Sequence, residues 1–158
     1  MRGSWYRWNK KDTTEDRLNL DMHRFSELVD LTSTRLGSWI WTRSNHFGES
    51  KSTIGYTVLP GRGVKLKYTA NEKDYEYLVR ISATQPNYGG VRYWWTCPNT
   101  NCNRRVRILY LQGGYFLCRH CQNLTYKSAQ ASNDLTDRIM GKMYAIRHKL
   151  GANGGIFE

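Results

Sequence analysis

The four cysteines of this chain lie within one 25-residue stretch and form two short-spaced pairs. Four residues separate Cys97 from Cys102, two separate Cys118 from Cys121, and fifteen lie between the pairs. Four thiolates at such spacing can converge tetrahedrally on one ion, and a site of cysteines alone is typical of structural zinc. We therefore predict that all four bind a structural Zn²⁺ ion. An iron–sulfur cluster is an alternative without separate support in the sequence.

A closed four-thiolate site leaves the metal no open coordination position, so it does not activate water. His120 lies between the last two cysteines and could in principle replace one, but four cysteines complete the ligand set without it. The chain has no HExxH motif, Walker loop, dinucleotide fingerprint or Gly-x-Ser-x-Gly elbow. The sequence therefore favours a protein that is not an enzyme, with a metal-dependent nuclease kept as the third alternative.

Basic residues around the cysteines carry the second chemical signal. The net charge is +11, and residues 86–158 hold 10 Lys and Arg against 3 Asp and Glu, compared with 14 against 10 in residues 1–85. Such a balance favours polyanionic partners, nucleic acid above all. Interleaved aromatic rings could stack on bases while the cations hold phosphates. The predicted nucleic-acid contacts are Arg104, Arg105, Arg107, Arg119, Arg138, Lys142, Arg147 and Lys149.

Several predicted elements must position these residues. The first is an N-terminal arm over residues 1–35, in which we expect Asp21 to cap a short helix. Over residues 36–96, apolar and polar residues alternate with a period of two, and glycine- and asparagine-containing turns separate the runs. We predict a meander of five antiparallel strands whose last strand leads directly into Cys97. One face is aromatic and aliphatic. The other carries Lys65, Lys67, Arg80 and Arg92.

Residues 97–122 follow the pattern of a zinc ribbon, a hairpin between two cysteine turns. Residues 123–151 are the predicted C-terminal segment, a basic amphipathic helix. Its N-terminal cap is expected within residues 132–134 and its end at Gly151, and a tail follows over residues 152–158. Its apolar stripe is Leu135, Ile139, Met143, Ile146 and Leu150. The predicted fold class is α+β: an antiparallel β meander continuing into a four-cysteine zinc ribbon, followed by a C-terminal helix. No linker separates sheet from ribbon, so we expect one packed unit.

Two stretches around the cysteines carry a resemblance. The first is Gly89–Pro98 together with Cys102–Tyr110, and the second is Phe116–Tyr126 together with the helix end Arg147–Gly151. Together they resemble a family of uncharacterised zinc-ribbon proteins of bacteria and their mobile elements, best over residues 89–151. The resemblance implies the metal site and a role near phage or mobile DNA, where small proteins bind nucleic acid or inhibit host defence enzymes. Asn103 stands where the family has Gly, and Asn also tolerates the left-handed conformation of such a turn.

The leading hypothesis is a non-enzymatic zinc-ribbon protein that binds DNA or RNA mainly through phosphate. The alternative is a protein-interaction or inhibitor module, for example a mobile-element protein acting on a host defence or nucleic-acid enzyme, whose aromatic sheet face docks on another protein. No apolar run approaches the roughly 20 residues of a membrane span, and the N-terminus has no apolar signal segment. We expect a cytoplasmic protein with no membrane partner and no small-molecule substrate.

Overall fold

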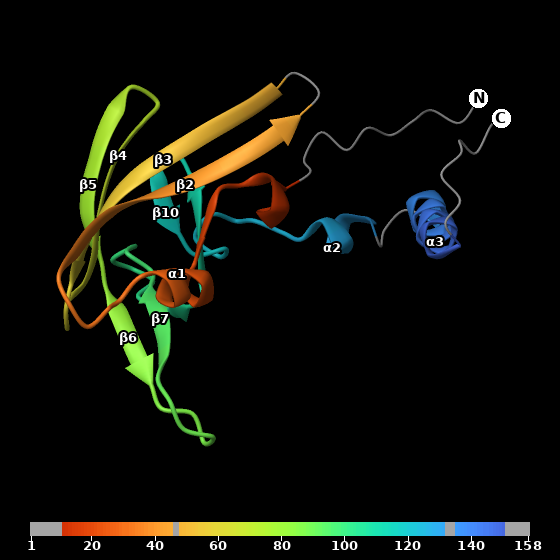
Figure 1. Cartoon of the computed structure of the whole chain (residues 1–158). Helices are drawn as coiled ribbons and strands as arrows, with labels where there is room; N and C mark the ends of the chain where they lie inside the picture. The colour runs from red at the N-terminus through yellow and green to blue at the C-terminus, as the bar shows by residue number, and fades with distance from the viewer. Residues whose placement is uncertain (1–10, 46–47, 132–134, 151–158) are drawn as a thin grey trace.

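The computed structural model describes residues 11–45, 48–131 and 135–150, which form three small antiparallel sheets and short helices (Figure 1). The four-stranded sheet has the order β2 (Arg35–Asn45), β3 (Gly48–Leu59), β4 (Gly63–Ala70), β5 (Lys73–Val79). The second sheet has the order β6 (Ile81–Thr84), β7 (Arg92–Thr96), β8 (Arg105–Val106). The third has the order β1 (Asn19–Asp21), β9 (Ile108–Gln112), β10 (Tyr115–Leu117).

Helices make up the rest of the regular structure. They are a 3₁₀ turn (Thr14–Asp16), α1 (Met22–Leu28), α2 (Lys127–Ala131) and α3 (Leu135–Lys149). The predicted α+β class, with mostly antiparallel sheets and a C-terminal helix, is confirmed. None of the helices in the described ranges combines the length and the apolar character that a membrane span needs.

The alternating run over residues 75–82 forms two strands in two different sheets, not one strand of a five-stranded meander. β5 ends at Val79 and β6 begins at Ile81, and the carbonyl of Arg80 between them accepts a hydrogen bond from the Thr96 N–H at 2.8 Å. Gly63 lies against this break, because a Cβ placed there would be 2.2 Å from the Val79 carbonyl oxygen. The missing side chain lets two backbones approach where the chain leaves one sheet for the next.

The N-terminal arm adds a strand that its local sequence pattern does not indicate. β1 pairs with β9 so that Leu20 lies opposite Leu109, and both side chains are fully buried. Asp21, the last residue of this strand, caps α1 as predicted, since its carboxylate accepts a hydrogen bond from the His23 N–H at 2.9 Å. The arm is therefore part of the core and not an irregular extension over the described residues 11–21.

Aromatic packing joins the sheets and the cysteine-containing hairpin in one hydrophobic core. The Phe25 ring of α1 lies 5.4 Å from Trp39 and 5.2 Å from Trp95, measured between ring centroids. Trp41 of β2 stacks on Phe116 of β10 at 5.9 Å. Because Phe116 belongs to the hairpin that leads into Cys118, sheet and hairpin pack as one unit, as expected. The aromatic face of the sheet is thus interior.

Helix α3 lies apart from the three sheets (Figure 1). The described members of the predicted apolar stripe remain 39–76% exposed, so the described part of the chain does not cover them. The exposed members are Ile139, Met143, Ile146 and Leu150. The predicted cap at 132–134, the end at Gly151 and the tail 152–158 lie outside the described residues.

The close approach at Gly63 makes Gly63→Ala a sharp test of the break between β5 and β6. Gly63 has a φ of 143°, and the added Cβ would meet backbone atoms that cannot rotate away. We expect a loss of unfolding free energy of about 3 kcal/mol or more in urea titrations. The control Gly61→Ala has a φ of 71° but open space around its Cβ. It should cost only about 1 kcal/mol, and equal losses would contradict the close approach.

Candidate metal centre and neighbouring arginines

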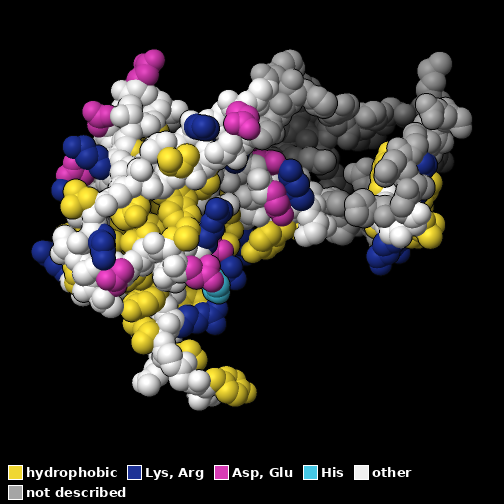
Figure 2. Space-filling view, in the orientation of Figure 1, with side chains coloured by type: hydrophobic (Ala, Val, Ile, Leu, Met, Phe, Trp, Pro, Cys, Tyr) yellow, Lys and Arg dark blue, Asp and Glu magenta, His cyan; other side chains and the backbone are white. Residues whose placement is uncertain are grey.

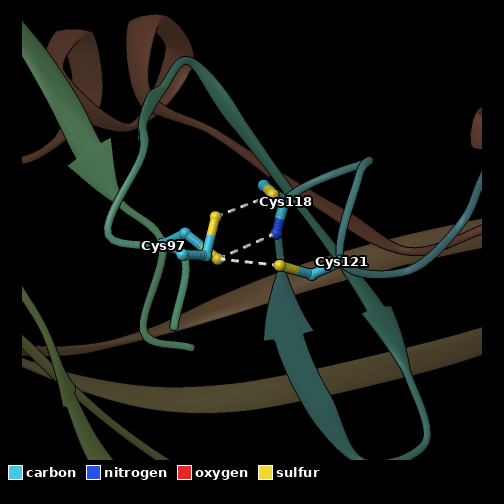
Figure 3. Close-up of side chains that lie close together, drawn as sticks. Cys97, Cys118 and Cys121 are labelled. Atoms are coloured by element: carbon cyan, nitrogen blue, oxygen red, sulfur yellow. Dashed lines mark hydrogen bonds between the residues drawn. The ribbon is translucent and has the colours of Figure 1, made fainter. Parts of the chain in front are cut away.

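Four cysteine sulfurs converge where strands of two sheets end (Figure 3). Cys97 directly follows β7, Cys102 lies in the turn before β8, and Cys118 directly follows β10. With Cys121, their Sγ atoms all lie within 4.8 Å of one another. The Sγ–Sγ distance is 3.9 Å between Cys97 and Cys121 and 3.7 Å between Cys102 and Cys118.

These distances fit a metal ion better than a disulfide. Tetrahedral bonds of about 2.3 Å to sulfur separate the sulfurs by about 3.8 Å, whereas a disulfide bond is only about 2.05 Å long. All four cysteines are free. Four sulfur donors suit a thiophilic ion and would fill its tetrahedral coordination. The cluster is therefore positioned to bind a metal ion in a closed site.

Backbone hydrogen bonds shape the first cysteine turn. The Cys102 N–H donates to the carbonyl of Asn99 at 2.9 Å, and the Cys97 N–H donates to the carbonyl of Arg104 at 2.9 Å. Asn103 has a φ of 48°, the left-handed conformation predicted for the position at which the resembling family has Gly. The turn therefore delivers Arg104 to the surface directly beside the cluster.

Gln122 ties the second cysteine turn to the β9–β10 hairpin. Its Nε2 donates to three hairpin carbonyls at 2.9–3.2 Å, those of Tyr110, Gln112 and Tyr115. The Cys118 N–H donates to the Cys97 Sγ at 3.4 Å, which links the two turns directly (Figure 3). The Asn99 side chain also donates to the Cys121 Sγ at 3.4 Å. Donors aimed at sulfur favour the thiolate form that a metal requires.

The cysteines differ in their protonation chemistry. Burial raises the pKa of Cys97 and of Cys121, whereas a backbone hydrogen bond from Arg104 lowers the pKa of Cys102. A bound cation would overcome the burial effect, because metal ligation displaces the thiol protons. His120 is exposed and is not one of the clustered ligands.

The four arginines predicted beside the cysteines have two different environments. Arg104 and Arg105 are exposed, and neither forms an ion pair with a carboxylate in the described ranges. Arg107 instead binds the Asp21 carboxylate through two hydrogen bonds, at 2.9 and 2.7 Å. Arg119 lies 5.0 Å from the Tyr126 ring centroid and donates to the Leu124 carbonyl. Two of the four are thus engaged in holding the fold.

Opposing effects act on Asp21. Partial burial raises the pKa of its carboxyl, but the Arg107 guanidinium and the His23 N–H outweigh burial, and the net pKa is lowered. The same contact raises the pKa of Arg107. Both groups therefore stay charged at neutral pH, and two of the five Arg107 donors already bind the Asp21 carboxylate.

The cations predicted on the C-terminal helix are not gathered at the cysteine cluster, because α3 lies apart from the sheets (Figure 1). Lys142 and Lys149 are exposed, and Arg147 is half-buried. The side chain of Arg138 lies outside the described part of the structure. Any role of these residues would belong to a surface separate from Arg104 and Arg105.

Two further arginines, one on the sheet that carries Arg105 and one directly before it, were not among the predicted contacts. The Arg80 guanidinium donates to the Asn103 side-chain oxygen at 2.6 Å, and the Arg92 guanidinium lies 4.2 Å from the centroid of the Trp94 ring. A signal for them exists in the sequence. Residues 77–133 contain seven Lys and Arg but no Asp or Glu, so a local charge count singles out this stretch.

Comparison of the chain with models of known protein families, with curated proteins and with solved structures finds no match. The resemblance to a zinc-ribbon family therefore stays a prediction.

The cluster predicts one bound metal ion per chain. Cys118→Ser should lose the ion and lower the thermal midpoint by at least about 6 °C, because a lost structural ligand leaves the closed site unfilled. Native mass spectrometry reports the ion, and thermal unfolding reports the midpoint. His120→Ala, between two ligands but outside the cluster, should change neither. A Cys118→Ser protein that keeps the ion and the midpoint would contradict the site.

The Arg107–Asp21 contact predicts energetic coupling between the cysteine-containing hairpin and α1. In a double-mutant cycle, Arg107→Ala and Asp21→Ala should each destabilise the protein, and the double variant should lose less than the sum. The cycle also separates the coupling energy of the Arg107–Asp21 ion pair from the energy that Asp21 contributes as the cap of α1. Arg105→Ala, two residues away and exposed, should leave the unfolding free energy unchanged. Additive losses would show that the contact contributes nothing.

Proposed function

We propose that this chain is a non-enzymatic nucleic-acid-binding protein in which a structural zinc ion shapes a zinc ribbon. Four sulfur donors at tetrahedral spacing, with the β9–β10 hairpin between the two cysteine pairs, support this assignment. With all four positions filled by protein, the ion would hold the turns together and would offer no site for a water nucleophile. The chemistry then falls to the side chains that the turns present.

The observation that carries the proposal is the availability of Arg104 and Arg105. They follow Cys102 after a single residue, Asn103, they are exposed, and no carboxylate in the described ranges pairs with them. A free guanidinium presents a planar fork of donors that matches a phosphate group. Arg107, between β8 and β9, provides the contrast, because the Asp21 carboxylate already neutralises its charge and accepts two of its donors.

The positive charge around the cysteines is larger than the negative charge of a zinc-bound cysteine cluster. A zinc ion with four thiolates carries a net charge of −2, and nearby cations offset it. Residues 77–133 hold seven Lys and Arg and no Asp or Glu; Arg107 and Lys127 pair with Asp21 and Asp16, and the remaining five still exceed that charge. The surplus supports an external polyanion as partner.

A second candidate function, protein binding, is favoured by α3. The aromatic sheet face considered for this role is occupied by the core, whereas Ile139, Met143 and Ile146 of α3 are exposed. An amphipathic helix of this kind can lie in the apolar groove of a partner. The exposed Lys142 and Lys149 would favour a groove with an acidic rim.

Salt dependence tests the leading proposal. The affinity for a fluorescent oligonucleotide, measured by anisotropy, should fall steeply with salt, with a log–log slope of about −0.7 to −0.9 per phosphate contact. The double variant Arg104→Ala/Arg105→Ala should weaken binding and reduce the slope by roughly 1.5. Lys51→Ala/Arg62→Ala removes the same charge from the four-stranded sheet and serves as the control. Affinity indifferent to salt, or equal losses in both double variants, would sink the proposal.

A further inference from the structure

The β6–β7–β8 sheet has one face in the core and one face directed outward. Trp95 is fully buried and Tyr93 packs against the core. Because side chains alternate along a strand, Arg92 and Trp94 point to the opposite face. Directly paired residues share a face, so the outward set is completed by Thr84 of β6 and by Arg105 of β8; Ser82 lies on the same face, but its hydroxyl is buried. We call this set the outer face.

The outer face is cationic and has no acidic neighbours along the chain. Arg92 and Arg105 lie on it, and Arg80 lies at its edge, where it binds Asn103 in the first cysteine turn. In the described ranges, none of the three forms an ion pair. Three guanidinium groups from three different strands or strand ends thus share one surface without a counter-charge.

An ordered stack lies in the middle of this surface. The Trp94 indole N–H donates to the Thr84 hydroxyl at 2.9 Å, which fixes the ring, and the Arg92 guanidinium lies over it at 4.2 Å. This distance is that of a cation–π interaction, and the Arg92 side chain remains exposed. Nucleic-acid bases stack on aromatic rings and on such guanidinium planes.

An exposed aromatic ring extends the surface beyond the sheet. The loop between β6 and β7 contains a turn closed by the Gly89 N–H and the Pro86 carbonyl at 3.1 Å, and within it Tyr88 is fully exposed. Figure 1 shows the β6–β7 hairpin projecting from the body, and Figure 2 shows apolar side chains at its tip. A ring presented in this way has no packing role in the described structure.

Building on the nucleic-acid function proposed above, we infer that the outer face and the hairpin tip bind single-stranded nucleic acid. Bases stack on Tyr88 and on the Arg92–Trp94 pair, while Arg105 and Arg80 hold phosphates. The aromatic groups select the single strand, because the faces of paired bases are already covered by their neighbours in a duplex. A surface of arginines alone would bind either form through phosphate.

The test compares an oligothymidylate of about 12 nucleotides, within the range of single-stranded sites, with its duplex and with the matching oligouridylate. At low salt the single strands should bind at least about ten-fold tighter than the duplex. Tyr88→Ala should weaken single-strand binding by about five-fold or more. The separate variant Tyr88→Phe keeps the aromatic ring and should bind the single strand as tightly as the unchanged protein. Arg92→Ala should weaken binding, whereas the exposed control Arg62→Ala in the β3–β4 turn should not. The two single strands report whether DNA or RNA is preferred.

The outcomes separate this inference from the function on which it rests. If single strand and duplex bind equally and Tyr88→Ala has no effect, while Arg104→Ala/Arg105→Ala still weakens binding, the inference fails and the nucleic-acid function stands. If no oligonucleotide binds at low salt, both fail, and a protein partner becomes the better explanation of the surface. Unchanged thermal midpoints of the Tyr88 and Arg92 variants show that they remain folded.

Discussion

The convergence of four cysteine sulfurs is the constraint on which the rest of this structure depends. Cys97 and Cys102 lie in the segment between β7 and β8, and Cys118 directly follows β10, so the cluster joins two of the three sheets. The sheets are small, and β8 has only two residues. Such short strands cannot hold their relative position by backbone hydrogen bonds alone. A metal ion held by the four cysteines would add the missing restraint to that of the shared aromatic core.

The same constraint divides the arginines into two groups. Arg107 and Arg119 lie where the hairpin meets α1 and where the second cysteine turn meets the following segment, and each has protein partners. Arg104 and Arg105 leave the first turn toward solvent, beside Arg80 and Arg92 of the same sheet region. Similar residues within a few positions of one another thus serve stability in one case and are available for binding in the other.

The local sequence pattern was sufficient to predict much of the fold and the four cysteines of the candidate metal site. The period of two predicted β3, β4 and β5, Asp21 predicted the start of α1, and the cysteine spacing predicted the cluster. Three features were not predictable in this way: the break at Arg80, the pairing of β1 with β9, and the exposure of the α3 stripe. Each depends on contacts between segments that are distant in sequence, and such contacts leave no periodic trace in either segment.

By itself, the sequence determined the composition of the site: four thiols in two pairs, and a basic stretch without carboxylates around them. These are local properties, because ligand spacing and charge are written along the chain. Only the tertiary structure decided which cations remain available. Asp21 is 86 residues from Arg107, and their pairing follows from β1 lying beside β9. Whether a charge is free depends on what folding brings next to it, and no single segment contains that information.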